Sequence, residues 1–93
     1  MGKITLNSVV IQTEGFVSAH LDGETFLMSI EEGTYFGFDT ILSRIWEDLK
    51  SPISVSDHID KLLENYDVAR QECEADVLDV LKDMYDDDLI SVQ

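Results

Sequence analysis

The hydrophobic pattern of the chain changes period near its middle, and this change limits the possible folds more than any other feature. Before this change, three segments are rich in the β-branched and aromatic residues that are typical of strands. They are residues 9–21, 25–30 and 34–39. Asp22 and Gly23 supply the positive φ angles of a tight hairpin turn, and Gly15 indicates a turn or bulge in the first segment. These segments predict a three-stranded antiparallel meander whose last strand is a sheet edge.

After this point apolar residues recur every three or four positions, which is the period of one helix face. The first predicted helix carries the apolar residues Ile41, Leu42, Ile45, Trp46 and Leu49. Asp39 or Thr40 can cap its start. Ser51-Pro52 ends it, because a proline cannot continue the hydrogen-bond ladder.

Two further helices are predicted. Ser54 and Asp57 resemble a capping box at the start of the second helix. Asp67 is the candidate cap of the third, which runs from about residue 68 to about residue 86. The apolar face of the third helix is Cys73, Val77, Val80, Leu81 and Met84. In the tail, Leu89 and Ile90 are expected to pack back onto the core. The order predicts a single α+β domain over residues 1–93, a winged helix-turn-helix with a three-stranded antiparallel sheet followed by three α-helices.

The charge balance narrows the possible partners. Six Lys and Arg residues stand against 20 Asp and Glu residues, a formal net charge of −14. Such a chain repels nucleic acid, which needs cations that neutralise phosphates, and it also repels anionic membranes. From residue 68 onward only Arg70 and Lys82 are basic, so the third helix is not expected to enter a DNA groove. A basic or mixed-charge partner is favoured.

No residue pattern indicates catalysis or a resident cofactor. His20 and His58 lie in different predicted elements, without metal-ligand spacing, and both are expected to be exposed. Cys73 is expected to be a small buried apolar residue. A single cysteine excludes an internal disulfide and fits a reducing cytoplasm, and no signal peptide is evident. We therefore expect a cytoplasmic protein that is not an enzyme and binds no metal.

The third predicted strand is the candidate binding element. Phe36 and Phe38 share one of its faces, and Tyr35 and Gly37 share the other. A free strand edge is a template for another chain, and many domains add a peptide there as an extra strand. A cleft between this strand and the third helix would be lined by aromatic residues of the strand on one side. On the other side it would be lined by the apolar face and the acidic residues of the helix.

The sequence also resembles a known family. GTYFGFDTILSRIWEDL resembles the Gly-x-Tyr-Tyr-x-Leu-Asn…Ile-Trp-x-Leu signature of PqqD-like proteins, with Phe36, Phe38 and Asp39 at the second aromatic, the Leu and the Asn. SVSDHIDKLLENYDV and ECEADVLDVLKDMYDDDLI are similar to the family's two later segments. Asp88 replaces the usual Gly before Leu-Ile, so the last turn is expected to differ. The resemblance covers roughly residues 9 to 92.

The resemblance implies a recognition element for ribosomally made, post-translationally modified peptides (RiPPs). Such domains bind the leader segment of a precursor as a strand added to the third strand, beside the third helix, and present it to a processing enzyme. The strand edge and the facing helix give the expected leader-binding residues, which are Thr34, Tyr35, Phe36, Gly37, Asp76, Val77, Val80, Leu81 and Met84.

The resemblance favours the stand-alone leader-binding proteins of lasso-peptide biosynthesis, whose partner is a leader peptidase. Their leaders often carry a Tyr-x-x-Pro segment and basic residues. One alternative is a pyrroloquinoline quinone-type peptide chaperone for a radical SAM enzyme. Another is a helix-turn-helix protein with a regulatory or dimerising role and no leader peptide.

Overall fold

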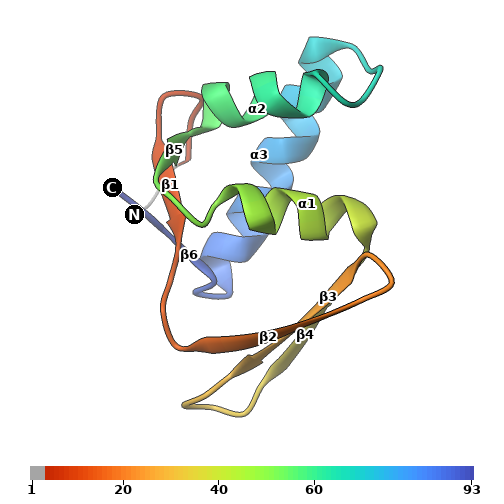
Figure 1. The fold of residues 1–93 in the computed structure, drawn as a ribbon. Helices are drawn as coiled ribbons and strands as arrows, with labels where there is room; N and C mark the ends of the chain where they lie inside the picture. Colours follow the sequence, from red (N-terminus) through yellow and green to blue (C-terminus); the bar gives the residue numbers. More distant parts are fainter. Residues whose placement is uncertain (1–3) are drawn as a thin grey trace.

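The computed structural model describes residues 4–93 as an α+β fold (Figure 1). The helices stack above a three-stranded sheet, and a second small sheet closes one side of the helical layer. No helix in this range is both long and apolar enough to cross a membrane. The elements in chain order are β1 (Val9–Gln12), β2 (Phe16–Leu21), β3 (Glu24–Ser29), β4 (Tyr35–Phe38), α1 (Thr40–Asp48), β5 (Ile53–Ser54), α2 (Val55–Leu63), α3 (Arg70–Asp86) and β6 (Ile90–Val92).

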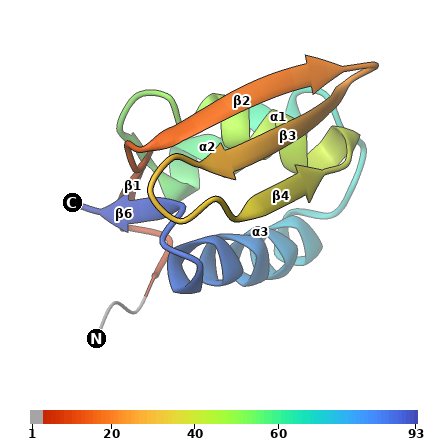
Figure 2. The same cartoon turned by 90° about the horizontal axis from the view of Figure 1, so that it is seen from below.

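The predicted antiparallel meander is confirmed as the sheet β2-β3-β4. Asp22 and Gly23 have φ angles of 54° and 83°, so they form the expected hairpin turn between β2 and β3. β4 pairs with β3 on one side only, and it is therefore a sheet edge. Figure 2 shows β4 running beside α3, with the other two strands farther away.

The second sheet, in the order β5-β1-β6, was not predicted. The segment 9–21 was expected to be one strand, but it is two strands that belong to different sheets. Gly15, with φ 98°, marks the change of direction between them. β5 and β6 have two and three residues, and their pairing with β1 joins distant parts of the chain, so no local turn signal could reveal it.

The helix starts follow from their caps. Asp39 accepts a hydrogen bond of 2.9 Å from the Leu42 amide at the start of α1, and Ser54 accepts one of 3.1 Å from the Asp57 amide at the start of α2. Ser54 was the predicted cap of α2, and Asp39 was one of the two candidates for α1, the other being Thr40. The prediction of Asp67 as the third cap was wrong: Ala69 occupies that position and its side chain makes no capping bond.

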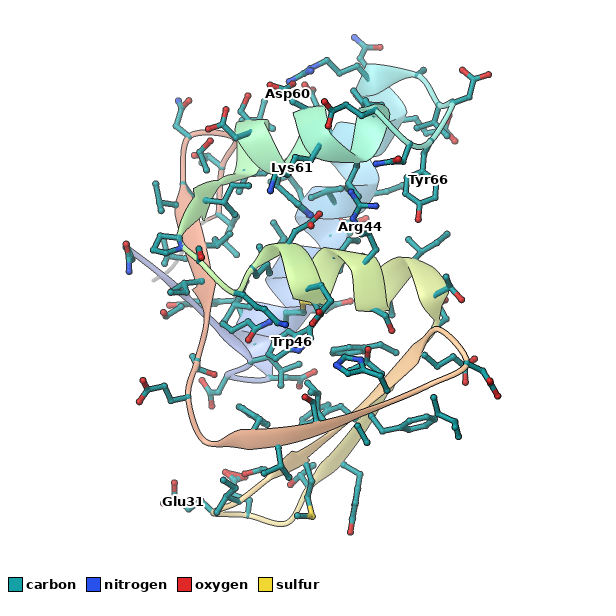
Figure 3. The ribbon with its side chains drawn as sticks, viewed as in Figure 1. Glu31, Arg44, Trp46, Asp60, Lys61 and Tyr66 are labelled. Carbon is teal, nitrogen blue, oxygen red and sulfur yellow. The ribbon has the colours of Figure 1, made fainter. Side chains whose placement is uncertain are left out.

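The core lies where the helices meet the inner face of the meander. Trp46 of α1 packs on Phe38 of β4 with ring centroids 5.8 Å apart, and it points from α1 toward the sheet (Figure 3). Leu89 and Ile90 are 1% and 2% exposed, which confirms that the tail packs back onto the core. Ile90 also begins β6, so the tail is part of a sheet.

α3 ends in a Schellman motif whose key residue is an aspartate. The Leu89 amide donates to the Met84 carbonyl at 2.8 Å, and the Asp88 amide donates to the Tyr85 carbonyl at 3.0 Å. Asp88 has φ 61°, the left-handed conformation that normally favours glycine. The turn therefore keeps the glycine-type geometry although the sequence carries an aspartate there.

We expect Asp88→Gly to raise the free energy of unfolding by about 1 kcal/mol, because glycine adopts a positive φ without steric cost and a carboxylate at a helix C-terminus opposes the helix dipole. Chemical denaturation of both proteins measures the difference. Asp83→Gly is the matched control: it removes the same charge from an exposed position but introduces glycine inside the helix, so it should destabilise. Equal effects of the two substitutions would contradict this account of the turn.

His58 was expected to be exposed, and this was wrong, since it is 0% exposed. α2 begins at Val55, so His58 falls on the same face as Val55, Ile59 and Leu62. Its Nε2 lies 3.4 Å from an Asp48 carboxylate oxygen, but neither ring nitrogen makes a hydrogen bond among the described residues. Burial lowers the pKa of His58 below 6.5 despite the opposing charge of Asp48.

This burial predicts a stability that depends on pH. A folded His58 resists protonation, with nearby Lys61 and Arg44 also opposing it, whereas an unfolded His58 binds a proton below about pH 6.5. The unfolded state then binds more protons, so the free energy of unfolding falls as the pH drops from about 6.5 toward the lowered pKa. As the pH drops over this range, the free energy of unfolding of the wild type should fall relative to that of His58→Gln. A pH-independent difference would show that His58 is not held neutral.

Candidate functional site

The free edge of β4 exposes the backbone groups of two residues. The Ser29 amide donates to the Thr34 carbonyl at 2.8 Å, and the Ile30 amide donates to the Gly15 carbonyl at 2.9 Å. Because hydrogen-bonded and non-bonded pairs alternate along an antiparallel ladder, the backbone of Phe36 faces β3 opposite Leu27. The amide and carbonyl groups of Tyr35 and Gly37 therefore point away from the sheet.

Side chains from β4 and α3 line a groove beside this edge. Phe36 is half-buried and Phe38 is buried, whereas Tyr35 is 75% exposed on the opposite face, as its alternation predicts. The groove has a volume of about 110 Å³, and we call it the edge groove. Its lining residues are Phe36, Phe38, Leu42, Val80, Asp83, Met84, Asp87 and Leu89.

A larger hollow of about 310 Å³ continues the edge groove toward the C-terminus of α3, and the two share Phe36 and Asp87. We call it the acidic hollow, and its lining residues are Phe16, Ser29, Glu32, Thr34, Phe36, Asp86, Asp87 and Asp88. Phe16 and Phe36 meet edge to face, with centroids 6.2 Å apart. Among residues 4–93, no Lys, Arg or His lines either space.

In the part of the chain that the structure describes, no cation pairs with the acids of the acidic hollow. Within residues 4–93, ion pairs engage acids elsewhere, for example Asp60 and Glu74 around Arg70, with N–O distances of 2.7 and 3.0 Å. Glu32, Asp86, Asp87 and Asp88 have no such partner in the described part of the chain. The hollow therefore attracts a cation that reaches it from outside.

The structure distributes the nine expected binding residues over several places. Phe36, Val80 and Met84 come together in the edge groove, Thr34 lies in the acidic hollow, and Tyr35 and Gly37 present the strand edge. Asp76 and Val77 instead line a separate hollow between the three helices. Leu81 is 0% exposed and lies in the core.

Four residues from outside β4 that line the edge groove were not predicted from the sequence. Leu42 comes from α1, and Leu89 comes from the turn after α3. Asp83 and Asp87 border Met84 on the exposed side of α3. Of these residues, Asp83 could have been predicted from the sequence. It lies one turn after Val80, so it falls on the same side of α3, which faces β4.

The described part of the chain offers little to a metal ion. No group of three or more His, Cys, Asp or Glu side chains within residues 4–93 is arranged to hold one. The site therefore consists of a strand edge, an apolar groove and a carboxylate-lined hollow. This combination can hydrogen-bond an extended backbone, bury apolar side chains and attract a cation.

Two comparisons with known proteins find matches to this chain. The family model described as "Coenzyme PQQ synthesis protein D (PqqD)" matches residues 24–90. A solved structure, "TbiB1 in Complex with the TbiA(beta) Leader Peptide", is similar, with a TM-score of 0.80 and 33% sequence identity. The similarity covers 87% of this chain and 94% of that chain. No curated protein sequence matches the chain.

Proposed function

Because the chain belongs to the PqqD family, we propose that it is a non-catalytic adaptor for a ribosomally synthesised precursor peptide. The leader segment of the precursor adds as a strand to the free edge of β4, beside α3. The adaptor then presents the precursor to a processing enzyme. The observation that carries this proposal is the placement of an unpaired strand edge directly beside an apolar groove.

Each part of the proposed site has a counterpart in an extended peptide. The outward amide and carbonyl groups of Tyr35 and Gly37 pair with the peptide backbone. Alternate side chains of an added strand point to the same face of the sheet as Phe36 and Phe38, so apolar anchors enter the edge groove. A basic side chain enters the acidic hollow, where its cation meets the carboxylates and the Phe16–Phe36 ring pair.

A lasso-peptide leader peptidase is the processing partner that we favour. The strand sequence Gly33-Thr34-Tyr35-Phe36 and the later Ile45-Trp46 resemble the lasso branch, and the similarity to TbiB1, solved with a leader peptide, supports leader binding. The description of the matching family model supports an alternative, a peptide chaperone in the synthesis of pyrroloquinoline quinone.

Calorimetric titration with synthetic leader peptides tests the proposal. The TbiA(beta) leader represents one class, and a leader from a pyrroloquinoline quinone precursor represents the other. Saturable binding of one leader, with the other silent, supports the adaptor function and identifies the class of pathway. If neither binds a chain that circular dichroism shows to be folded, the leader-binding proposal is overturned in favour of a regulatory or dimerising role.

The net charge of −14 predicts that binding of a basic leader depends on ionic strength. We expect the association constant to fall as salt rises, because attraction between surface charges is screened beyond roughly 8 Å at physiological ionic strength. Titrations across a salt series measure this slope. Substituting Asp87 and Asp88 together with Asn should flatten the slope, and an unchanged slope would place the leader cation elsewhere.

A further inference from the structure

A second apolar hollow opens between the three helices, away from the sheet. It has a volume of about 160 Å³, and we call it the helical hollow. Its lining residues are Ile41, Ile45, Leu62, Tyr66, Val68, Cys73, Asp76 and Val77. Two of its apolar residues are unusually accessible: Ile41 is 55% exposed and Val68 is 46% exposed. Figure 3 shows Tyr66 extending from the connection after α2 toward α1.

The helical hollow continues the line of the edge groove. Leu42 of α1 lines the edge groove, and its neighbour Ile41 lines the helical hollow. On α3, Val80 lines the first and Val77, one turn earlier, lines the second. β4 runs toward the start of α1, as Figure 2 shows, so a strand added to β4 is directed toward Ile41 as it leaves the sheet.

We propose that the helical hollow is a second anchor pocket for the same peptide, and that it takes one apolar side chain from the residues beyond the segment paired with β4. This inference rests on the proposed function and extends it to a longer recognition sequence. The leader would then carry two apolar anchors, one for the edge groove and one for the helical hollow.

The dimensions suit this arrangement. Met84 and Val77 are seven positions apart on α3, which corresponds to about 10 Å along the helix axis. An extended peptide spans this distance with about three residues. A dry cavity of about 150 Å³ can hold a group of the size of benzene, so the helical hollow has room for one branched or aromatic side chain.

The electrostatics favour a peptide over a second copy of this chain. Asp76 is exposed at the hollow and has no ion-pair partner among the described residues. A cation next to the apolar anchor would complement Asp76. A second copy would bring another net charge of −14 to the same place, which opposes association.

The test uses a linear peptide selected from a random display library against the wild-type chain. The peptide is kept only if Gly37→Pro, which removes a donor at the free edge of β4, weakens its binding. It is then shortened stepwise from each end and titrated against the wild type and Ile41→Lys. Leu21→Lys is the matched control, because Leu21 is 64% exposed at the far end of β2 and makes no part of the three spaces.

We expect Ile41→Lys to weaken the full peptide about tenfold or more, the effect of losing one buried apolar side chain. Leu21→Lys should leave the affinity unchanged. Removing the anchor residue from the peptide should lower its affinity for the wild type by the same factor. It should lower the affinity for Ile41→Lys only slightly, because two changes that remove the same contact are not additive. Equal binding of the shortened and full peptides to the wild type would overturn the second pocket.

Cys73 provides a readout that does not depend on affinity. It is the single cysteine of the chain, it lines the helical hollow, and it is 7% exposed. Burial, and then the negative charge of Asp76, raise the pKa of its thiol, so its reaction with a thiol reagent is slow. At saturation the full peptide should slow this reaction further, whereas the peptide without its anchor should protect Cys73 less.

The outcomes separate the two proposals. If no selected peptide depends on the free edge of β4, the proposed function fails and the second pocket fails with it. If a peptide depends on β4 but is insensitive to Ile41→Lys and does not protect Cys73, only the second pocket is overturned. Sensitivity to Ile41→Lys together with protection of Cys73 supports both.

Discussion

Gly37→Pro should weaken leader binding about a hundredfold while the chain remains folded. The Gly37 amide points away from β3, so proline removes a donor that only the added strand uses. The loss of one hydrogen bond and the burial of an unpaired peptide carbonyl together cost about 3 kcal/mol. Proline is tolerated on edge strands, and a Cβ at this position meets its nearest atom, in the Phe26 ring, at 3.7 Å, an ordinary contact.

Gly37→Ala is the control that separates the amide from the side chain. Alanine adds a Cβ and keeps the donor, so it should bind a leader peptide nearly as well as the wild type does. Calorimetric titration gives the affinities, and circular dichroism with thermal unfolding shows that both variants fold. If a folded Gly37→Pro bound as tightly as Gly37→Ala, peptide addition at the free edge of β4 would be wrong.

Leu81→Ala should lower the free energy of unfolding by about 3 kcal/mol, the typical cost of deleting a buried leucine side chain. Leu81 is 0% exposed in the core, under the residues of α3 that line the edge groove. For a domain of this size the loss corresponds to a fall in Tm of about 15 °C or more. Denaturant unfolding with matched m-values provides the measurement.

Val80→Ala is the companion variant. Val80 is partly buried at the edge groove, so its truncation should cost about 1 kcal/mol or less in stability but should weaken leader binding severalfold. Leu81→Ala, measured where it is still folded, should bind nearly normally. The reverse pattern, with Leu81 controlling affinity and Val80 controlling stability, would mean that α3 presents another face to the peptide.

Local signals in the sequence were enough to predict the meander and the three helices. The Asp22-Gly23 turn, the caps at Asp39 and Ser54, and the alternation in β4 each depend on neighbouring residues, and each is confirmed. The second sheet depends on pairing between β1 and two very short strands far along the chain. Such pairing leaves no local pattern, because the partner strands are far apart in the sequence.

The candidate site could be predicted in position but not in detail. The apolar stripe of α3 indicated which side of the helix faces the protein, but not which stripe residues the core covers completely. Leu81 is enclosed by the core, whereas Val80, next to it in sequence, borders the edge groove. Asp76 and Val77 are a turn too far from β4 to reach the edge groove and lie beside α1 and α2 instead. That distinction depends on where α1 crosses α3.

His58 illustrates a different limit. Its position on the face of α2 shared with Val55, Ile59 and Leu62 was visible in the sequence, but a polar residue early in a helix is usually solvated. Burying it without a hydrogen bond has a cost that propensity cannot anticipate. Only the packing of α2 against α1, where Asp48 lies, explains its environment.

The attachment of β6 to β1 bears on how quickly a peptide can bind. The end of α3 is fixed by the Schellman turn, by the Thr13 amide and hydroxyl donating to the Leu89 and Asp88 carbonyls at 2.9 and 2.7 Å, and by the pairing of Ile90–Val92 with β1. One wall of the edge groove is therefore ordered before any ligand arrives. Little conformational entropy remains to be lost there on binding. Association with a cationic peptide should therefore be limited by electrostatically steered diffusion rather than by rearrangement of this chain.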